Sequence, residues 1–369
     1  MEFILKQKEL VKALNIVERG LGPRNVVESL NGIKMVAKNN NIIFIVSKTD
    51  LSIEYSLHTN NIIEEGAVIA LGQEFINIVK KIGEPDTEIK VKLEDRILTL
   101  KTNKSKVDLV TLDINEYPEI KFGIENDFAI IEKSVLRKIY NKTKYTTSKK
   151  NKDTLQSAIN LNFTQENLIA ASTDSNRLSY VLLDPISNFN TSVCIPKSSF
   201  SDIDKILDII DDKTVKFALV NKKIELETPQ LKIKSKAFEG EYPDVENTIP
   251  RNINYSFSVE NDKLLAALEK VKSLATTENS LITIENINKE LIVKFYVKEF
   301  GGIEEKVEIH NIIGNPYKMG FDLQFVIDAL HSISDYEVKF GFSAETAPFK
   351  ITSKMNENNI QIISPIRIS

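Results

Sequence analysis

Apolar and polar positions along this chain follow one order that is written three times. A phenylalanine opens a similar helical pattern at Phe75, Phe200 and Phe325, so that the three copies stand 125 residues apart. Solenoid repeats have periods of about 20–50 residues, whereas a period of 125 residues is the size of a domain. The pattern therefore predicts one domain repeated three times.

A second helix is predicted near the start of each third. Residues 9–14, 134–139 and 263–268 carry apolar residues at i, i+1 and i+4, which is one face of an amphipathic helix. Alternating strand patterns precede these helices, and others follow the phenylalanine helices, as at 3–5 and 89–93 in the first third.

Runs of strands interrupted by single helices favour an α+β fold with antiparallel sheets over a doubly wound parallel fold. We predict three domains at residues 1–125, 126–252 and 253–369, each with two helices packed on antiparallel sheet, because polar or turn-like segments lie at the two boundaries.

Composition limits the cellular environments that are expected for the protein. The chain has 369 residues, a formal net charge of −4 and one cysteine, Cys194, in an apolar strand pattern. No internal disulfide can form, no apolar stretch is long enough to span a membrane, and the N-terminus lacks a signal peptide. We expect a cytoplasmic protein without contact to a membrane.

The sequence offers little that suggests catalysis. Its histidines, His58, His310 and His331, do not have metal-ligand spacing, and neither a glycine-rich phosphate loop nor a G-x-S-x-G elbow occurs. We therefore expect no cofactor, no metal and no enzyme activity. An enzyme with a catalytic cleft between repeated domains stays open as an alternative, because carboxylates distant in sequence can still meet in space.

Positive charge is concentrated in one segment. Between Arg137 and Lys152 the chain carries seven basic residues and no acidic residue. Such a run is often a solvated loop. The alternative is a basic surface that holds a polyanion without reading its sequence.

Five short segments carry motifs that occur together in one known family. They are Leu21-Gly22-Pro23-Arg24, the turn Thr173-Asp174-Ser175-Asn176-Arg177-Leu178, Gly240-Glu241-Tyr242-Pro243-Asp244, the helix pattern at 320–330, and the tail Pro365-Ile366-Arg367-Ile368. In this order, on a threefold repeated chain, they resemble the bacterial sliding clamp, the beta subunit of DNA polymerase III.

The resemblance implies three clamp domains per chain and a ring-shaped homodimer closed head to tail. Double-stranded DNA would pass through the hole and be contacted without regard to sequence. The ring would serve as a DNA polymerase processivity factor. It would tether the replicative DNA polymerase, the clamp loader, repair polymerases and mismatch-repair proteins through short peptide motifs.

The resemblance also implies a peptide-binding pocket between the middle and last domains. Asn176, Asn247 and Ser364 depart from the residues that are usual in the family, so peptide preference is expected to differ. Without the resemblance, the turn is an ordinary hairpin turn and the tail a strand that stops at Pro365. The implied pocket residues are Leu155, Thr173, Ser175, Asn176, Arg177, Leu178, Pro243, Asn247, Thr248, Ile362, Ile363, Ser364, Pro365, Ile366, Arg367 and Ile368.

Two further sites are expected on the same basis. Contacts to DNA are expected from Arg24, Arg137, Lys144, Lys149, Lys150 and Lys152. The dimer interface is expected at Val107, Leu109 and Leu274, for which ordinary core positions are the alternative. A protein scaffold that binds only proteins is a third, weaker function, because it leaves the lysine-rich segment unexplained.

Overall fold

The computed structural model describes residues 1–22, 27–125, 127–150, 154–186, 189–275, 280–287, 289–297 and 301–368. The chain forms two compact units. Unit 1 comprises Met1–Arg137 and Ser198–Ala237, and unit 2 comprises Lys138–Lys197 and Phe238–Ser369. The division between the units falls inside the predicted middle domain, which contributes residues to both, and the three domain boundaries stay a prediction.

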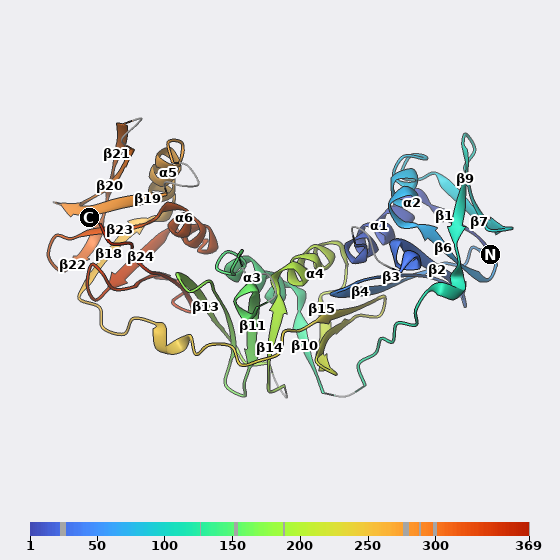
Figure 1. Cartoon of the computed structure of the whole chain (residues 1–369), viewed down its shortest axis with the longest axis horizontal. Coiled ribbons are helices and arrows are strands. Elements are labelled where there is room, and N and C mark those ends of the chain that lie inside the picture. The colour runs from blue at the N-terminus through green and yellow to red at the C-terminus, as the bar shows by residue number, and fades with distance from the viewer. Residues whose placement is uncertain are drawn as a thin grey trace. The chain divides into compact units, whose positions relative to one another are not determined.

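Unit 1 contains one sheet of 13 strands, in the order β10-β15-β16-β17-β4-β3-β2-β6-β9-β8-β7-β1-β5. Neighbouring strands pair antiparallel. Helices α1 (Gln7–Val17) and α2 (Gly72–Val79) lie against these strands (Figure 1). The strands are β1 (Glu2–Lys6), β2 (Gly32–Lys38), β3 (Asn41–Lys48), β4 (Leu51–His58), β5 (Ile62–Glu64), β6 (Gly66–Leu71), β7 (Glu88–Glu94), β8 (Ile97–Lys101), β9 (Lys106–Leu112), β10 (Phe128–Glu132), β15 (Thr214–Val220), β16 (Lys223–Glu227) and β17 (Leu231–Lys236).

The predicted periodicities account for these elements. Phe75, Ile76 and Val79 form the buried face of α2, and alternate residues of β3 are buried. The β2–β3 hairpin turns at Asn39 and Asn40, with φ of 51° and 57°. Positive φ at both central residues is the two-residue turn that fits the twist of paired strands, and asparagine tolerates it better than most residues.

Unit 2 contains a nine-stranded sheet, β14-β11-β12-β13-β26-β25-β24-β18-β22, and a four-stranded sheet, β21-β20-β19-β23. Helices α5 (Asn261–Lys272) and α6 (Leu323–Ser332) pack beside each other (Figure 1). Two further helices, α3 (Lys133–Thr143) and α4 (Lys197–Ile209), each begin in the residues of one unit and end in those of the other. The strands are β11 (Ala158–Phe163), β12 (Leu168–Thr173), β13 (Arg177–Leu183), β14 (Thr191–Pro196), β18 (Tyr255–Glu260), β19 (Leu281–Ile287), β20 (Glu290–Val297), β21 (Gly301–Glu308), β22 (His310–Ile313), β23 (Lys318–Asp322), β24 (Glu337–Phe342), β25 (Phe349–Ser353) and β26 (Asn359–Ile363).

Both large sheets cross the predicted repeat boundaries. In unit 1, β17 pairs with β4, with Leu231 opposite Tyr55. In unit 2, β13 pairs with β26, with Arg177 opposite Ile363. Sheet pairing therefore joins the predicted middle domain to each neighbour, in addition to the covalent chain.

A large apolar core lies in unit 2. It contains stacked aromatic rings, with the centroids of Phe257 and Phe340 4.7 Å apart, and the buried faces of α5 and α6 close it. Cys194 is buried in β14. The prediction of an α+β fold with antiparallel sheet is confirmed. Within the described residues, no helix is both long enough and apolar enough to cross a membrane.

Candidate peptide-binding site

A cavity of about 310 Å³ opens on unit 2 where the β12–β13 turn, the segment after Gly240 and the end of β26 meet. We call it the peptide cavity. Its lining residues are Gln156, Thr173, Ser175, Asn176, Arg177, Leu178, Pro243, Asp244, Val245, Thr248, Pro348, Ile362 and Ser364.

The apolar part of this cavity belongs to a small hydrophobic cluster. Ala171, Leu178 and Ile362 are buried at its centre, and Val245 packs against them from the side. A groove with apolar side chains at its base and polar groups at its rim suits an extended peptide with apolar anchors.

The β12–β13 turn is held by its own polar groups. Asp174 Oδ1 accepts hydrogen bonds from the backbone N–H groups of Asn176 and Arg177, both at 3.1 Å, and Thr173 Oγ1 donates to the Arg177 carbonyl at 2.7 Å. Ser175 has φ of +76°, which is uncommon for a residue other than glycine. The Ser175 hydroxyl accepts a hydrogen bond from Gln156 Nε2 at 2.8 Å, which helps to hold the turn in this conformation.

The segment after Gly240 lies close to the turn. The Thr173 N–H donates to the Tyr242 hydroxyl at 3.0 Å, and burial raises the pKa of Tyr242, so that it remains a neutral phenol. Gly240 has φ of +121°, and a Cβ there would lie 3.1 Å from Leu155 Cδ1. A side chain at this position would therefore be strained and crowded. Leu155 supports this segment and does not line the cavity.

Arg177 connects the turn to α6. Its side chain is 5% exposed and forms ion pairs with Asp174 (Nε–Oδ2, 3.0 Å) and Asp328 (Nη1–Oδ2, 2.6 Å). The guanidinium carbon also lies 4.2 Å from the centroid of the Phe325 ring. Two carboxylates and an aromatic face thus compensate a buried positive charge.

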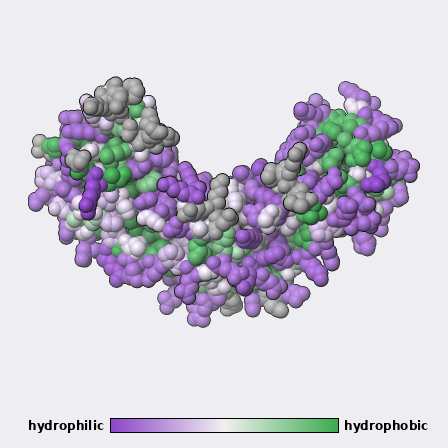
Figure 2. All heavy atoms as spheres, viewed as in Figure 1, coloured by the Kyte–Doolittle hydropathy of each residue, from purple (hydrophilic) through white to green (hydrophobic). Residues whose placement is uncertain are grey.

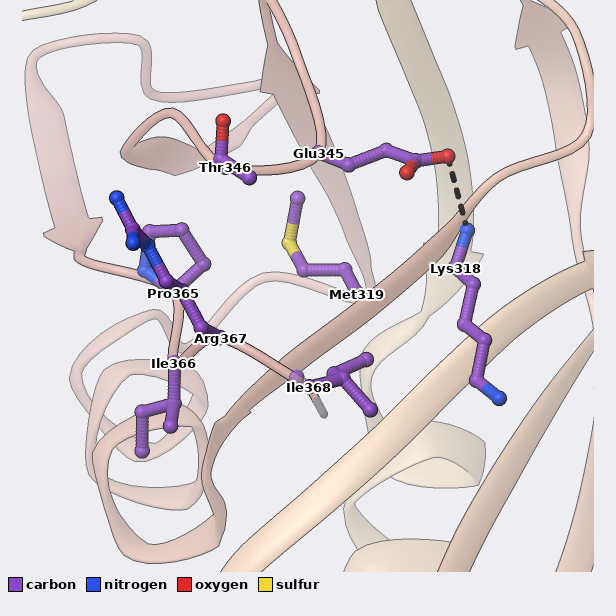
Figure 3. A pocket seen from close by; sticks show the side chains of 9 residues that line it. Lys318, Met319, Glu345, Thr346, Pro365, Ile366, Arg367 and Ile368 are labelled. Carbon is purple, nitrogen blue, oxygen red and sulfur yellow. Dashed lines mark hydrogen bonds between the residues drawn. The ribbon is translucent and has the colours of Figure 1, made fainter.

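The C-terminal tail continues from β26 past the cavity. The Ser364 N–H donates to the Asn176 carbonyl at 2.8 Å, and the Ile366 N–H donates to the Gly320 carbonyl of β23 at 2.7 Å. Beyond Ser364, the tail lines a separate cavity of about 510 Å³ (Figure 3). In this tail cavity, Pro365, Ile366, Arg367 and Ile368 lie opposite Glu345 and Thr346, and Met319 extends between them.

The structure brings together part of the implied pocket. Ile363 is in the core of unit 2, Asn247 donates to Asp244 at 2.6 Å outside the lining, and residues 365–368 line the tail cavity. Gln156, Asp244, Val245 and Pro348 line the peptide cavity although the predicted pocket residues did not include them. Gln156 is adjacent to the predicted Leu155, whereas no signal in the sequence points to Pro348.

The basic residues differ in their surroundings. Arg137 is ion-paired with Asp204 at 3.2 Å and Asp208 at 2.6 Å, whereas Lys149 and Lys150 are exposed. Lys144 Nζ lies 5.2 Å from the ring centroids of Tyr140 and of Tyr145. Arg24 and Lys152 lie outside the described residues.

Lys197, at the first position of α4, is a basic residue that sequence reasoning did not select. The pKa of this half-buried lysine is lowered mainly by burial and also by the nearby positive charges of Lys149 and Arg177. Lys197 therefore adds a further basic side chain to the surroundings of Lys149.

The predicted interface residues of unit 1 lie on β9. Val107 and Leu109 are half-buried and stand opposite Leu100 and Leu98 of β8. Among the strands that the structure describes, the other edge of β9 pairs with β6 only, through Thr111 and Leu112. Apolar surface gathers over the part of unit 1 that carries α2 and β9 (Figure 2). In unit 2, Leu274 is 44% exposed directly after α5.

These features define a class of protein: repeated α+β elements joined through their sheets, with a small cavity beside the β12–β13 turn. No cluster of three or more His, Cys, Asp or Glu side chains able to hold a metal ion occurs among the described residues. Models of the DNA polymerase III beta subunit match almost the whole chain, the N-terminal domain at residues 1–121, the central domain at 130–244 and the C-terminal domain at 246–367. The chain belongs to the DNA polymerase III beta subunit family.

Individual relatives are similar over their full length. A beta sliding clamp of Staphylococcus aureus is 27% identical over 379 residues, covering 100% of this chain and 99% of the relative, and that of Staphylococcus epidermidis is also 27% identical over 377 residues, with the same coverage. The crystal structure of the DNA polymerase sliding clamp of Bacillus subtilis superposes with a TM-score of 0.92 at 23% identity, over 100% of both chains. The crystal structure of a sliding clamp of Pseudomonas aeruginosa bound to griselimycin superposes with a TM-score of 0.93 at 21% identity, again over 100% of both chains.

Proposed function

We propose that this chain is the processivity factor of a bacterial replicase, a ring-shaped sliding clamp that encircles duplex DNA and tethers its partners through the peptide cavity. The observation that carries the proposal is a defined cavity with an apolar cluster around Leu178 and Ile362, at the junction of the second and third family domains, in a chain whose full length matches sliding clamps. No chemistry of its own is required, and the chain acts as an accessory subunit in the cytoplasm.

Two open sheet edges support closure of a head-to-tail homodimer. In unit 1, β9 leaves the backbone of residues 106–110 without a partner on one side among the described strands. In unit 2, β21 is an end strand of the four-stranded sheet. Pairing such edges between two chains would remove both, and half-buried Val107 and Leu109 would then be covered together with Leu274.

The DNA contacts would come from Lys144, Lys149 and Lys150, with Arg24, Arg137 and Lys152 as further candidates. Topological retention needs no tight contact, so mobile lysines without base recognition are sufficient. The partners of the peptide cavity would be the replicative DNA polymerase, the clamp loader, repair polymerases and mismatch-repair proteins, each through a short segment with apolar anchors.

Retention on closed DNA tests the function directly. The protein is loaded by a bacterial clamp loader onto a nicked circular plasmid, and the complex is separated by gel filtration before and after one restriction cut. A sliding ring stays with the circle and is lost from the linear product. Equal retention on circular and linear DNA would contradict the proposal, as would loss from both.

A further inference from the structure

A cavity of about 360 Å³ lies on one face of the nine-stranded sheet of unit 2. We call it the sheet cavity. Its lining comes from the neighbouring strands β26, β25, β24, β18 and β22, and from Ile253 and Glu357 in the connections between strands. Phe257 and Phe340 alternate with its lining residues and belong to the apolar core, so the sheet cavity lies on the opposite face. The residues that the structure describes in this lining are distinct from those of the peptide cavity and the tail cavity.

The sheet cavity is hollowed at Gly341 of β24. Gly341 stands opposite Ser256 of β18 on one side and opposite Lys350 of β25 on the other. Residues opposite each other in antiparallel strands point to the same face, with Cβ atoms about 4.5–5.5 Å apart, so Ser256 and Lys350 flank a position without a side chain. A Cβ on Gly341 would lie 3.3 Å from Ile253 Cδ1, so Ile253 covers the hollow. Lys339, two residues before Gly341, points to the same face.

Several polar groups of the sheet cavity are not engaged by the protein. Ser256 Oγ is buried and has no hydrogen-bond partner among the described residues. A buried hydroxyl without a partner is destabilising, so a ligand atom that reached it would remove that cost. Lys339 is exposed and Lys350 is half-buried, and neither forms an ion pair within the part of the chain that the structure describes.

The charge around the sheet cavity favours an anion with more than one negative charge. Lys339 and Lys350 contribute two positive charges and Glu357 contributes one negative charge. A phosphate monoester carries a charge of about −1.5 to −2 at pH 7 and presents three strong acceptor oxygens. Each ammonium group offers three donors, and the Ser256 hydroxyl offers one more. A carboxylate, with one charge and two oxygens, would leave more of these donors unused.

The remaining surface of the sheet cavity is apolar. Ile253, Ile313 and Ile360 line it, and Ile313 is 58% exposed on the edge strand β22. Sites for small molecules combine such apolar walls with a few polar groups that fix orientation, in volumes of about 300–1,000 Å³. The isoleucines therefore suit an apolar group attached to the anion.

We propose that the sheet cavity binds a small phosphate monoester with an apolar organic part. Lys339 and Lys350 hold the phosphate, the Ser256 hydroxyl donates to one of its oxygens, and the isoleucine side chains contact the organic part. This site is independent of the proposed clamp function, because it uses neither the peptide cavity nor the lysines assigned to DNA.

Calorimetry with the full chain and three probes tests the proposal. The probes are phenyl phosphate, inorganic phosphate and phenol. Wild type should bind phenyl phosphate about tenfold more tightly than inorganic phosphate, because the phenyl ring adds apolar contact, and phenol should bind at least about tenfold more weakly than phenyl phosphate.

Variants of the lining assign the binding to this cavity. Lys339→Gln and Lys350→Gln should each weaken phenyl phosphate binding about tenfold, since each removes a hydrogen bond to a charged group. Ser256→Ala should weaken it about threefold without lowering the unfolding temperature, because the hydroxyl has no partner to lose among the described residues. Glu357→Gln should strengthen it about threefold by removing a like charge. Lys38→Gln is the matched control, because Lys38 is an exposed lysine at the end of β2 in unit 1.

Two results would overturn the site itself. One is the absence of phenyl phosphate binding to wild type, and the other is equal affinity of the Lys339→Gln, Lys350→Gln and Lys38→Gln variants. Equal affinities of wild type for inorganic phosphate and phenyl phosphate would overturn the apolar part of the proposal. Retention on circular DNA should be the same in all these variants, so a failure here is distinguishable from a failure of the proposed function.

Discussion

At the scale of single residues, the peptide cavity depends on side chains that restrain one another. Sequence motifs could indicate the turn from Thr173 to Leu178, because the residues that form such a turn are neighbours in the sequence. They could not indicate Asp328, which lies 151 residues beyond Arg177. An ion pair of this kind exists only once α6 and β13 have been brought together.

Ser175 gives a direct measure of the strain in the turn. Replacement by glycine removes the cost of φ at +76° and also the hydrogen bond from Gln156, so the free energy of unfolding should change by less than about 1 kcal/mol. Replacement by valine keeps the strain and adds a β-branched side chain, so it should destabilise by about 1–3 kcal/mol. Urea unfolding of both variants measures this, and a valine variant as stable as wild type would show that the turn relaxes.

Glu285 gives a pH dependence of known sign. Its hydrogen bond with Lys294, at 2.9 Å, and the contact with Lys318 hold the pKa of Glu285 below the ordinary 4.5. The stabilisation is present above pH 4.5 and is lost as the pH falls through the lowered pKa. In Lys294→Gln, NMR titration of the Glu285 carboxyl should show a pKa closer to 4.5, and an unchanged titration would contradict the assignment.

At the scale of helices and strands, the repeated pattern was a good guide. The phenylalanine helices appear as α2, α4 and α6. The pairing of β17 with β4 and of β13 with β26 could not be predicted, because alternation shows which face of a strand is buried and not which strand lies beside it.

The base of the peptide cavity and the tail should contribute unequally to binding. Leu178→Ala removes a buried side chain from the central cluster and should weaken peptide binding at least tenfold. Deleting residues 366–369 removes the Ile366–Gly320 hydrogen bond but leaves Ser364 and Ile362 in place, so affinity should fall by less. Calorimetry with one peptide on both variants measures the two losses of affinity. A larger loss in the deletion variant than in Leu178→Ala would indicate that the peptide binds in the tail cavity.

At the scale of the whole molecule, the proposed function would depend on where positive charge and open sheet edges lie, and much less on the net charge of −4. Lys144, Lys149 and Lys150 lie in one short segment, whereas acidic residues compensate Arg137. The open edge of β9 likewise matters only when a second chain is present.

Duplex binding should therefore respond unequally to neutralisation of basic residues. Lys144→Gln, Lys149→Gln and Lys150→Gln together should flatten the slope of log affinity against log salt by up to about 0.9 for each phosphate that is no longer neutralised. Arg137→Gln should change it less, since Asp204 and Asp208 already hold that charge. Fluorescence anisotropy on linear duplex DNA gives the slopes. An equal change of slope for the triple lysine variant and for Arg137→Gln would contradict this prediction.

Dimer formation should fail when charge is placed on β9. Val107→Asp with Leu109→Asp would bury two unpaired carboxylates in the expected interface, at a cost of several kcal/mol. Sedimentation equilibrium should then find one chain of 41.8 kDa instead of two. Thr99→Asp with Lys101→Asp on adjacent β8 is a control for added charge, and a double variant of β9 that remains dimeric would place the interface elsewhere.

The sheets that cross the repeats also set the order in which the molecule can be completed during synthesis. At about 5–20 residues per second, the edge of β4 waits roughly 10–40 s for β17, and that of β13 waits about as long for β26. Unpaired edges invite aggregation during this interval. The peptide cavity receives Ile362 and Ser364 among the last residues made. A chain that ends before β26 therefore lacks part of the peptide cavity, and with it part of the proposed docking site.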